Sequence, residues 1–127
     1  MAVMQRAPAR GRLLIVDDDE DVRVMMQDVM ERRGYEVIAV DSGADALALL
    51  AFDVPELILL DLEMYDVNGW EVLGALERHP MFGKFRVVVV SGANGRVPKW
   101  AGYLKKPFKI EALEELLAHG APAPVRA

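Results

Sequence analysis

Short apolar runs that do not alternate with polar residues constrain the fold of this chain more than any other feature. The runs are residues 13–16, 37–40, 57–60 and 87–90, and a shorter one follows at 103–104. A strand that is buried on both faces has this pattern, which is typical of parallel sheets covered by helices on each side. Segments with helical spacing separate the runs. The order therefore predicts an α/β fold, a doubly wound sheet of five parallel strands.

The segments between the runs have apolar residues three and four positions apart, as in amphipathic helices. The positions that this spacing places on buried helix faces are Val22, Met25, Met26, Val29, Met30, Ala46, Leu47, Leu50, Trp70, Leu73, Leu76, Ile110, Leu113, Leu116 and Leu117. Val24 lies off the first of these stripes. We expect Gly34 to end the first helix, Asp41 or Ser42 to cap the second, and Asn68-Gly69 to precede the third.

Length and charge exclude several classes of protein. The chain has 127 residues, the size of one domain, and a net charge of −5. It has no cysteine and no apolar run long enough for a membrane helix. These features predict a cytoplasmic protein that binds neither nucleic acid nor membranes. We expect a flexible basic arm over residues 1–11, one domain over 12–119 and a flexible tail over 120–127.

Chemically reactive residues stand where the predicted strands end. Asp17 and Asp18 follow the first strand, and Asp61, Ser91 and Lys106 follow the third, fourth and fifth. Ligands of such sheets bind at the carboxyl ends of the strands. Carboxylates gathered there repel one another, and Mg²⁺ or Mn²⁺ would relieve the repulsion. A metal, a lysine and a nucleophilic aspartate together suit the transfer of a phosphoryl group to a carboxylate.

Five motifs in this order resemble the receiver domain of bacterial two-component response regulators. They are LLIVDDDEDVR, ELILLDLEM, DVNGWEVL, VVVVSGA and GYLKKPF, and they span residues 13 to 117. The resemblance implies the flavodoxin-like strand order 2-1-3-4-5. It also implies a stand-alone receiver that takes a phosphoryl group from a sensor histidine kinase or a histidine phosphotransfer protein and then acts on an unknown downstream protein. Such a protein catalyses its own phosphorylation and dephosphorylation and is not otherwise an enzyme.

The resemblance also implies a role for individual residues. Asp61 is the phosphoacceptor, and Lys106 contacts the phosphoryl group; the peptide bond from Lys106 to Pro107 is expected to be cis. Asp17 and Asp18 hold Mg²⁺ together with Asp61 and the backbone carbonyl of Glu63.

A conformational switch is implied as well. Ser91 captures the phosphoryl group, and the ring of Tyr103 moves inward when Ser91 is drawn toward Asp61.

The segment between Ser91 and Tyr103 departs from the family pattern. It has eleven residues, GANGRVPKWAG, which is short for a full helix. Its glycines and Pro98 also oppose one. We therefore expect the fourth helix to be shortened or missing, with at most one turn near Pro98, and Trp100 either to fill the core or to bind a partner. Since this helix helps many receivers to dimerise, any homodimer would use a different face.

The remaining acids of the opening motif have simpler roles. Glu20 and Asp21 suit the first turn of a helix, where they complement the helix dipole. The role of Asp19 is left open between a charge at the rim and a partner of the metal ligands.

Two other functions stay open at this point. One is a receiver fold that serves as a binding module without being phosphorylated, which the short segment after Ser91 favours. The other is a phosphatase with an aspartate nucleophile, since Glu63 follows Asp61 by two residues. Mg²⁺ binding would disfavour the first alternative, and sustained turnover of a phosphate ester would favour the second.

Overall fold

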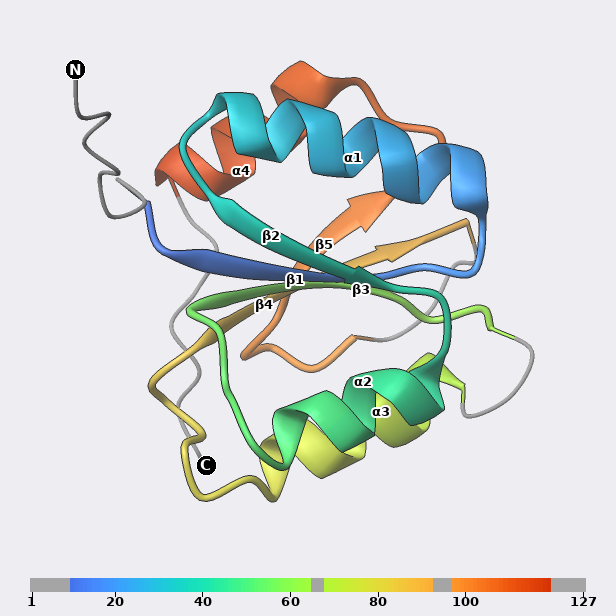
Figure 1. Ribbon diagram of the computed structural model, residues 1–127. Coiled ribbons are helices and arrows are strands. Elements are labelled where there is room, and N and C mark those ends of the chain that lie inside the picture. Colours follow the sequence, from blue (N-terminus) through green and yellow to red (C-terminus); the bar gives the residue numbers. More distant parts are fainter. Residues whose placement is uncertain (1–9, 65–67, 93–96, 120–127) are drawn as a thin grey trace, which may run out of the picture.

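A computed structural model describes residues 10–64, 68–92 and 97–119. Its five strands form one parallel sheet in the order β2-β1-β3-β4-β5 (Figure 1). The strands are β1 (Arg12–Val16), β2 (Glu36–Val40), β3 (Leu57–Asp61), β4 (Arg86–Ser91) and β5 (Gly102–Lys105). The predicted fold class and strand order are confirmed.

Four helices cover the sheet in two layers. Helices α1 (Glu20–Arg32) and α4 (Ile110–His119) lie on one face, and α2 (Gly43–Leu50) and α3 (Gly69–Glu77) lie on the other (Figure 1). Each layer encloses its own apolar cluster. Met26, Met30 and Leu113 are buried on the α1–α4 side, and Ala46, Val72 and Leu76 on the α2–α3 side. Burial on both faces explains why β3 is apolar at every position before Asp61.

Side-chain caps fix where three helices begin. The side chains of Asp19, Ser42 and Asn68 accept hydrogen bonds from the backbone N–H groups of Val22, Asp45 and Glu71, respectively. The helix α1 ends before Gly34, which has a φ of +97° and donates its N–H to the carbonyl of Glu31. This is the left-handed position that favours glycine after a helix. The cap at Ser42, the start of α3 after Asn68 and the end of α1 before Gly34 agree with the sequence.

Two residues assigned to buried helix faces are exposed instead. Met25 is 43% exposed and Trp70 is 46% exposed, whereas Val24 is 58% exposed as its position predicts. Met25 lies at the border of the buried stripe of α1, and Met26 and Met30 fill the core beside it. On α3, Gly69 takes the buried place next to Trp70, because the start of the helix lies against the backbone of Asp61 and Leu62.

The connection from β4 to β5 contains no helix among its described residues, Gly92 and 97–101. A turn closes with a hydrogen bond from the N–H of Ala101 to the carbonyl of Pro98. Trp100 packs against the α2–α3 core cluster and meets Phe82 edge to face at 5.1 Å between ring centroids. The missing fourth helix is thus confirmed for the described residues, and the half-buried Trp100 packs on the core from the loop. Residues 93–96 lie outside the described part.

The predicted arm and tail fall largely outside the described residues, which begin at Arg10 and end at His119. Within residues 10–64, 68–92 and 97–119, no helix has the length and apolar character needed to cross a membrane.

Candidate phosphoryl-transfer site

The carboxyl ends of β1, β3 and β4 bring three polar side chains into the interior. Asp17 is 2% exposed, Asp61 4% and Ser91 1%, and these are the buried polar residues of the described chain. They come from parallel neighbouring strands, which end at the same edge of the sheet. The structure therefore places these three residues at one edge of the sheet, where the sequence led us to expect them.

Asp17, Asp18 and Asp61 form an acid cluster. One carboxylate oxygen from each lies within 4.8 Å of the others, and Asp18 is half-buried. Oxygens of this kind are the ligands that Mg²⁺ prefers, and one or two carboxylates suffice because the ion keeps several waters. A hollow of about 510 Å³, lined by Asp18, Asp19, Glu63 and Met64, opens beside Asp18. The donor set therefore fits a hydrated divalent cation.

Lys106 supplies the positive charge of the site. Its Nζ lies 2.9 Å from Oδ2 of Asp17 and 3.6 Å from Oδ2 of Asp61. Burial lowers the pKa of this ammonium, but the two carboxylates outweigh burial and the pKa is raised overall. The peptide bond from Lys106 to Pro107 is cis, as expected, and the N–H of Lys106 donates to the carbonyl of Ser91. Lys106 is thus tied to both β4 and the acid cluster.

Asp61 has an unusual affinity for protons. Burial raises its pKa from 3.8 to about 6, and the charges of Asp17 and Asp18 act in the same direction. The N–H of Glu63, which donates to Oδ1 of Asp61 at 3.1 Å, and the ammonium of Lys106 oppose this rise. The carboxylate therefore ionises at a cost that a bound cation would remove.

Glu63 enters the site through its side chain. The hydroxyl of Ser91 donates a hydrogen bond to Oε1 of Glu63 at 3.1 Å, although the Glu63 residue as a whole is exposed. The sequence assigned the backbone carbonyl of Glu63 to the metal site and its carboxylate only to the phosphatase alternative. No motif shows that this side chain turns toward Ser91. The structure adds this contact between the ends of β3 and β4.

Tyr103 lies behind Ser91 on β5. Its ring is half-buried against the α2–α3 core cluster, and its hydroxyl lies 3.5 Å from the carbonyl of Ser91. The predicted pair of Ser91 and Tyr103 is therefore adjacent in space, while its movement stays a prediction.

Asp19 and Gly69 have structural roles that the sequence did not determine. Asp19 caps α1, and its N–H donates to Oδ1 of Asp17 at 2.9 Å, which orients that carboxylate. A Cβ on Gly69 would lie 2.3 Å from Cα of Leu62 and 2.5 Å from the carbonyl oxygen of Asp61. Only glycine lets α3 approach the strand end this closely. The consecutive acids and the Asn-Gly pair were visible signals, but each allowed several roles.

Known proteins resemble this chain in sequence. The family model described as "Response regulator receiver domain" matches residues 13–118. The response regulator protein FleR of Pseudomonas aeruginosa is 31% identical over 87% of this chain and 24% of its own length. Protein PilG of the same organism is 28% identical over 85% of this chain and 86% of its own length. The chain thus spans about a quarter of one relative and most of the other.

Solved structures agree with the sequence relatives. The response regulator protein TrrA of Thermotoga maritima, in complex with Mg²⁺ and BeF, has a TM-score of 0.74 and 25% identity, covering 84% of this chain and 96% of TrrA. A CheY-like response regulator receiver domain protein from Methanospirillum hungatei has a TM-score of 0.72 and 28% identity, covering 82% and 88%. The chain belongs to the response regulator receiver domain family of bacterial two-component systems.

Proposed function

We propose that the protein accepts a phosphoryl group from a phosphohistidine onto Asp61, with Mg²⁺, and thereby changes its binding to a downstream protein. The donor would be a sensor histidine kinase or a histidine phosphotransfer protein. The observation that carries the proposal is the acid cluster beside Lys106, with three carboxylate oxygens within 4.8 Å of one another. Membership of the receiver family supports it.

The residues around Asp61 suit this transfer. One carboxylate oxygen of Asp61 forms a bond to phosphorus while the bond from phosphorus to the imidazole nitrogen breaks, and the electron pair of that bond stays on the imidazole. Lys106, already 3.6 Å from Asp61, would contact a phosphoryl oxygen. Asp17, Asp18, Asp61 and the carbonyl of Glu63 would hold Mg²⁺, which when bound neutralises the oxygens of the transferring group.

Ser91 and Tyr103 would report the modification. Ser91 would transfer its hydroxyl hydrogen bond from Glu63 to a phosphoryl oxygen and draw the end of β4 inward. Because the hydroxyl of Tyr103 lies near the carbonyl of Ser91, its ring would sense that movement. A preference of a few kcal/mol between two states is sufficient for a switch.

Labelling with acetyl phosphate tests the proposal. Intact-protein mass spectrometry should show one added phosphoryl group in the presence of Mg²⁺ and none after chelation. Asp61→Asn should abolish the addition, whereas Asp28→Asn, which removes an exposed acid on α1, should leave it unchanged. Equal labelling of Asp61→Asn and the unmodified chain would rule out Asp61 as the acceptor.

A further inference from the structure

A second hollow lies at the opposite edge of the sheet, where the strands begin. It measures about 380 Å³, and its lining comes from the segment before β1, the loop from α1 to β2, the starts of β3 and β4, and the end of α4. The residues of this lining that the argument uses are Arg10, Tyr35, Glu56, Leu57, Arg86 and Leu117. Because β1, β3 and β4 run parallel, this hollow is separated from the acid cluster by the length of the sheet.

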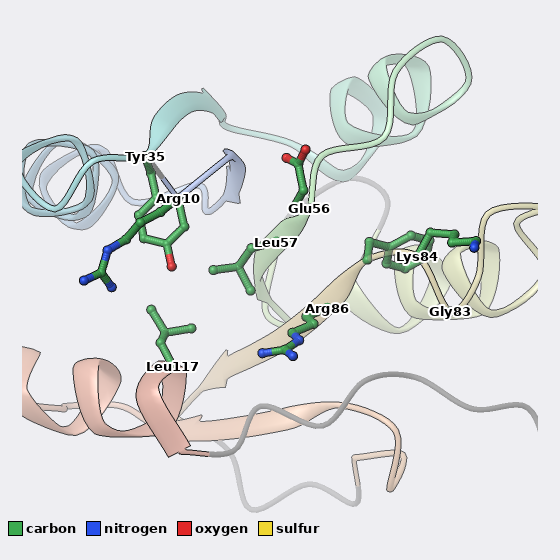
Figure 2. A pocket seen from close by; sticks show the side chains of 9 residues that line it. Arg10, Tyr35, Glu56, Leu57, Gly83, Lys84, Arg86 and Leu117 are labelled. Carbon is green, nitrogen blue, oxygen red and sulfur yellow. The ribbon is translucent and has the colours of Figure 1, made fainter. Parts of the chain in front are cut away.

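Apolar and cationic side chains face this hollow together. Figure 2 shows the side chains of Tyr35, Leu57, Leu117 and Arg86 turned toward a common space, with the guanidinium of Arg10 beside Tyr35 at its margin. Leu57 is 5% exposed and forms the floor, and Tyr35 and Leu117 pack on the α1–α4 core cluster. The hollow can thus enclose an apolar group and present a guanidinium to it from the side.

The cations at the hollow have no carboxylate partner of their own. Within residues 10–64, 68–92 and 97–119, neither Arg10 nor Arg86 forms an ion pair. Glu56 also lines the hollow, but it points away in Figure 2 and accepts a hydrogen bond from the N–H of Arg12 at 2.6 Å. A guanidinium group that has no ion-pair partner is suited to bind an oxyanion, to which it can donate two parallel hydrogen bonds.

Two further acids line a hollow that also contains Arg10. An adjoining hollow of about 370 Å³ shares Arg10, Tyr35 and Leu117 and adds Glu114 and Glu115. Glu114 is paired with Arg33, while Glu115 is exposed and lines the same adjoining hollow as Arg10. Arg10 thus shares a hollow with an acid that forms no ion pair among the described residues, whereas Arg86 does not line that adjoining hollow.

We propose that this hollow binds a small organic anion, with the oxyanion on Arg86 and Arg10 and an aromatic or branched apolar body against Tyr35, Leu57 and Leu117. The volume admits one ring with a short side arm, not a folded partner. A carboxylate and a phosphate monoester have the same chemistry toward guanidinium, so the probes must separate them. The proposal does not depend on phosphorylation of Asp61.

Three probes without added Mg²⁺ test the site: phenylacetate, phenyl phosphate and the neutral isostere phenylacetamide. In two-dimensional amide NMR, the two anions should shift the signals of Tyr35, Leu57 and Arg86, and phenylacetamide should bind about tenfold more weakly. Whichever of phenylacetate and phenyl phosphate binds more tightly shows whether the site prefers a carboxylate or a phosphate monoester. Without metal, the acid cluster repels anions, so its signals should not move.

Variants of matched charge complete the test. Arg86→Gln should weaken phenylacetate binding about fivefold or more and Arg10→Gln somewhat less, because Arg10 also shares a hollow with Glu115. Lys84→Gln, at the same rim but with its ammonium turned away in Figure 2, should leave binding unchanged. Equal binding of phenylacetamide, equal affinity of Arg86→Gln, or shifts confined to Asp18 and Glu63 would each overturn the proposal. Thermal melting of every variant checks that it folds.

Discussion

At the carboxyl edge of the sheet, Asp17 and Asp61 are almost fully buried, and one ammonium serves both. At the amino edge, Arg10, Lys84 and Arg86 are exposed and carry no ion pair among the described residues. Charge is therefore concentrated and desolvated at one edge and dispersed in solvent at the other. Buried charge of one sign destabilises a fold until a counter-ion binds, while exposed charge costs little.

The two edges of the sheet also use glycine differently. The positive-φ residues of the described chain, Gly11, Gly34 and Gly83, precede strands at the amino edge. At the carboxyl edge glycine serves a different purpose, since Gly69 has ordinary φ and provides space for α3 against Leu62. The amino edge needs glycine to turn the chain, and the carboxyl edge needs it to pack the site tightly.

The largest effect should come from adding one carbon at the tight edge. Gly69→Ala should destabilise the fold by about 3 kcal/mol or more, because its Cβ would overlap backbone atoms of Asp61 and Leu62. Gly74→Ala on the same helix is the control: its Cβ would meet only the movable end of Arg78 at 3.2 Å. That variant should be neutral or stabilised by up to about 1 kcal/mol. Urea denaturation measures both, and equal behaviour of the two variants would contradict the packing argument.

Asp61→Asn should stabilise the metal-free protein at pH 8. The folded pKa of about 6 exceeds the ordinary 3.8, so folding favours the protonated carboxyl. The stabilisation that protonated Asp61 contributes is fully present below pH 3.8. It is lost as the pH rises from 3.8 through 6, and the free energy of unfolding falls by about 3 kcal/mol. The asparagine variant avoids that loss, so its advantage should be largest at pH 8 and small near pH 4. Urea titrations at both pH values measure it, and a constant difference would contradict a buried, reluctantly ionised Asp61.

Mg²⁺ should reduce the repulsion among the carboxylates of Asp17, Asp18 and Asp61 and so stabilise the fold. At a concentration one hundred times its dissociation constant, a ligand of the folded state adds about 2.7 kcal/mol to stability and raises Tm accordingly. Asp18→Ala should abolish most of this gain. Asp19→Asn keeps a capping side chain on α1 but removes the neighbouring charge, so it should retain most of the gain. If both variants lost the gain equally, general acidity and not a defined site would explain it.

Much of this edge was predictable from the sequence because topology determines it. The ends of parallel strands meet, so Asp17, Asp61, Ser91 and Lys106 had to lie near one another once the strands were recognised. Helix periodicity identified the buried side of each helix but not the border residues Met25 and Trp70, whose exposure depends on neighbouring packing. The spacing of apolar residues along a helix says little about which residues at the edge of its buried face are exposed.

Contacts that depend on loop direction and tertiary packing were not predictable. The hydrogen bond from Ser91 to Glu63 depends on how the loop after β3 turns, and no motif encodes that direction. The hollow at the amino edge is built from Arg10, Tyr35, Arg86 and Leu117, which lie on four separate segments without a shared spacing. Both features arise from tertiary placement, and only a structure reveals them.

Lys106→Gln should destabilise the metal-free protein at neutral pH by roughly 2 kcal/mol. The change leaves the buried carboxylates of Asp17 and Asp61 without their cation, and the loss is moderated because Lys106 keeps 24% of its side chain exposed. In the Asp61→Asn background the loss should be smaller, since only Asp17 then needs the charge. A double-mutant cycle by urea denaturation measures this coupling, and strict additivity would show that Lys106 does not act on Asp61.

Arg86→Gln is the counterpart at the amino edge and should change stability by less than about 0.5 kcal/mol, because the guanidinium is exposed and has no ion pair among the described residues. The same substitution of charge by amide thus has a several-fold smaller effect than at Lys106. Phenylacetate should raise the Tm of the unmodified chain and raise that of Arg86→Gln less, since a ligand stabilises only the state that binds it. A loss above 1 kcal/mol without ligand would mean that Arg86 has a structural partner. The charge of Arg86 would then stabilise the fold, as that of Lys106 does at the carboxyl edge, and would not serve to bind an anion.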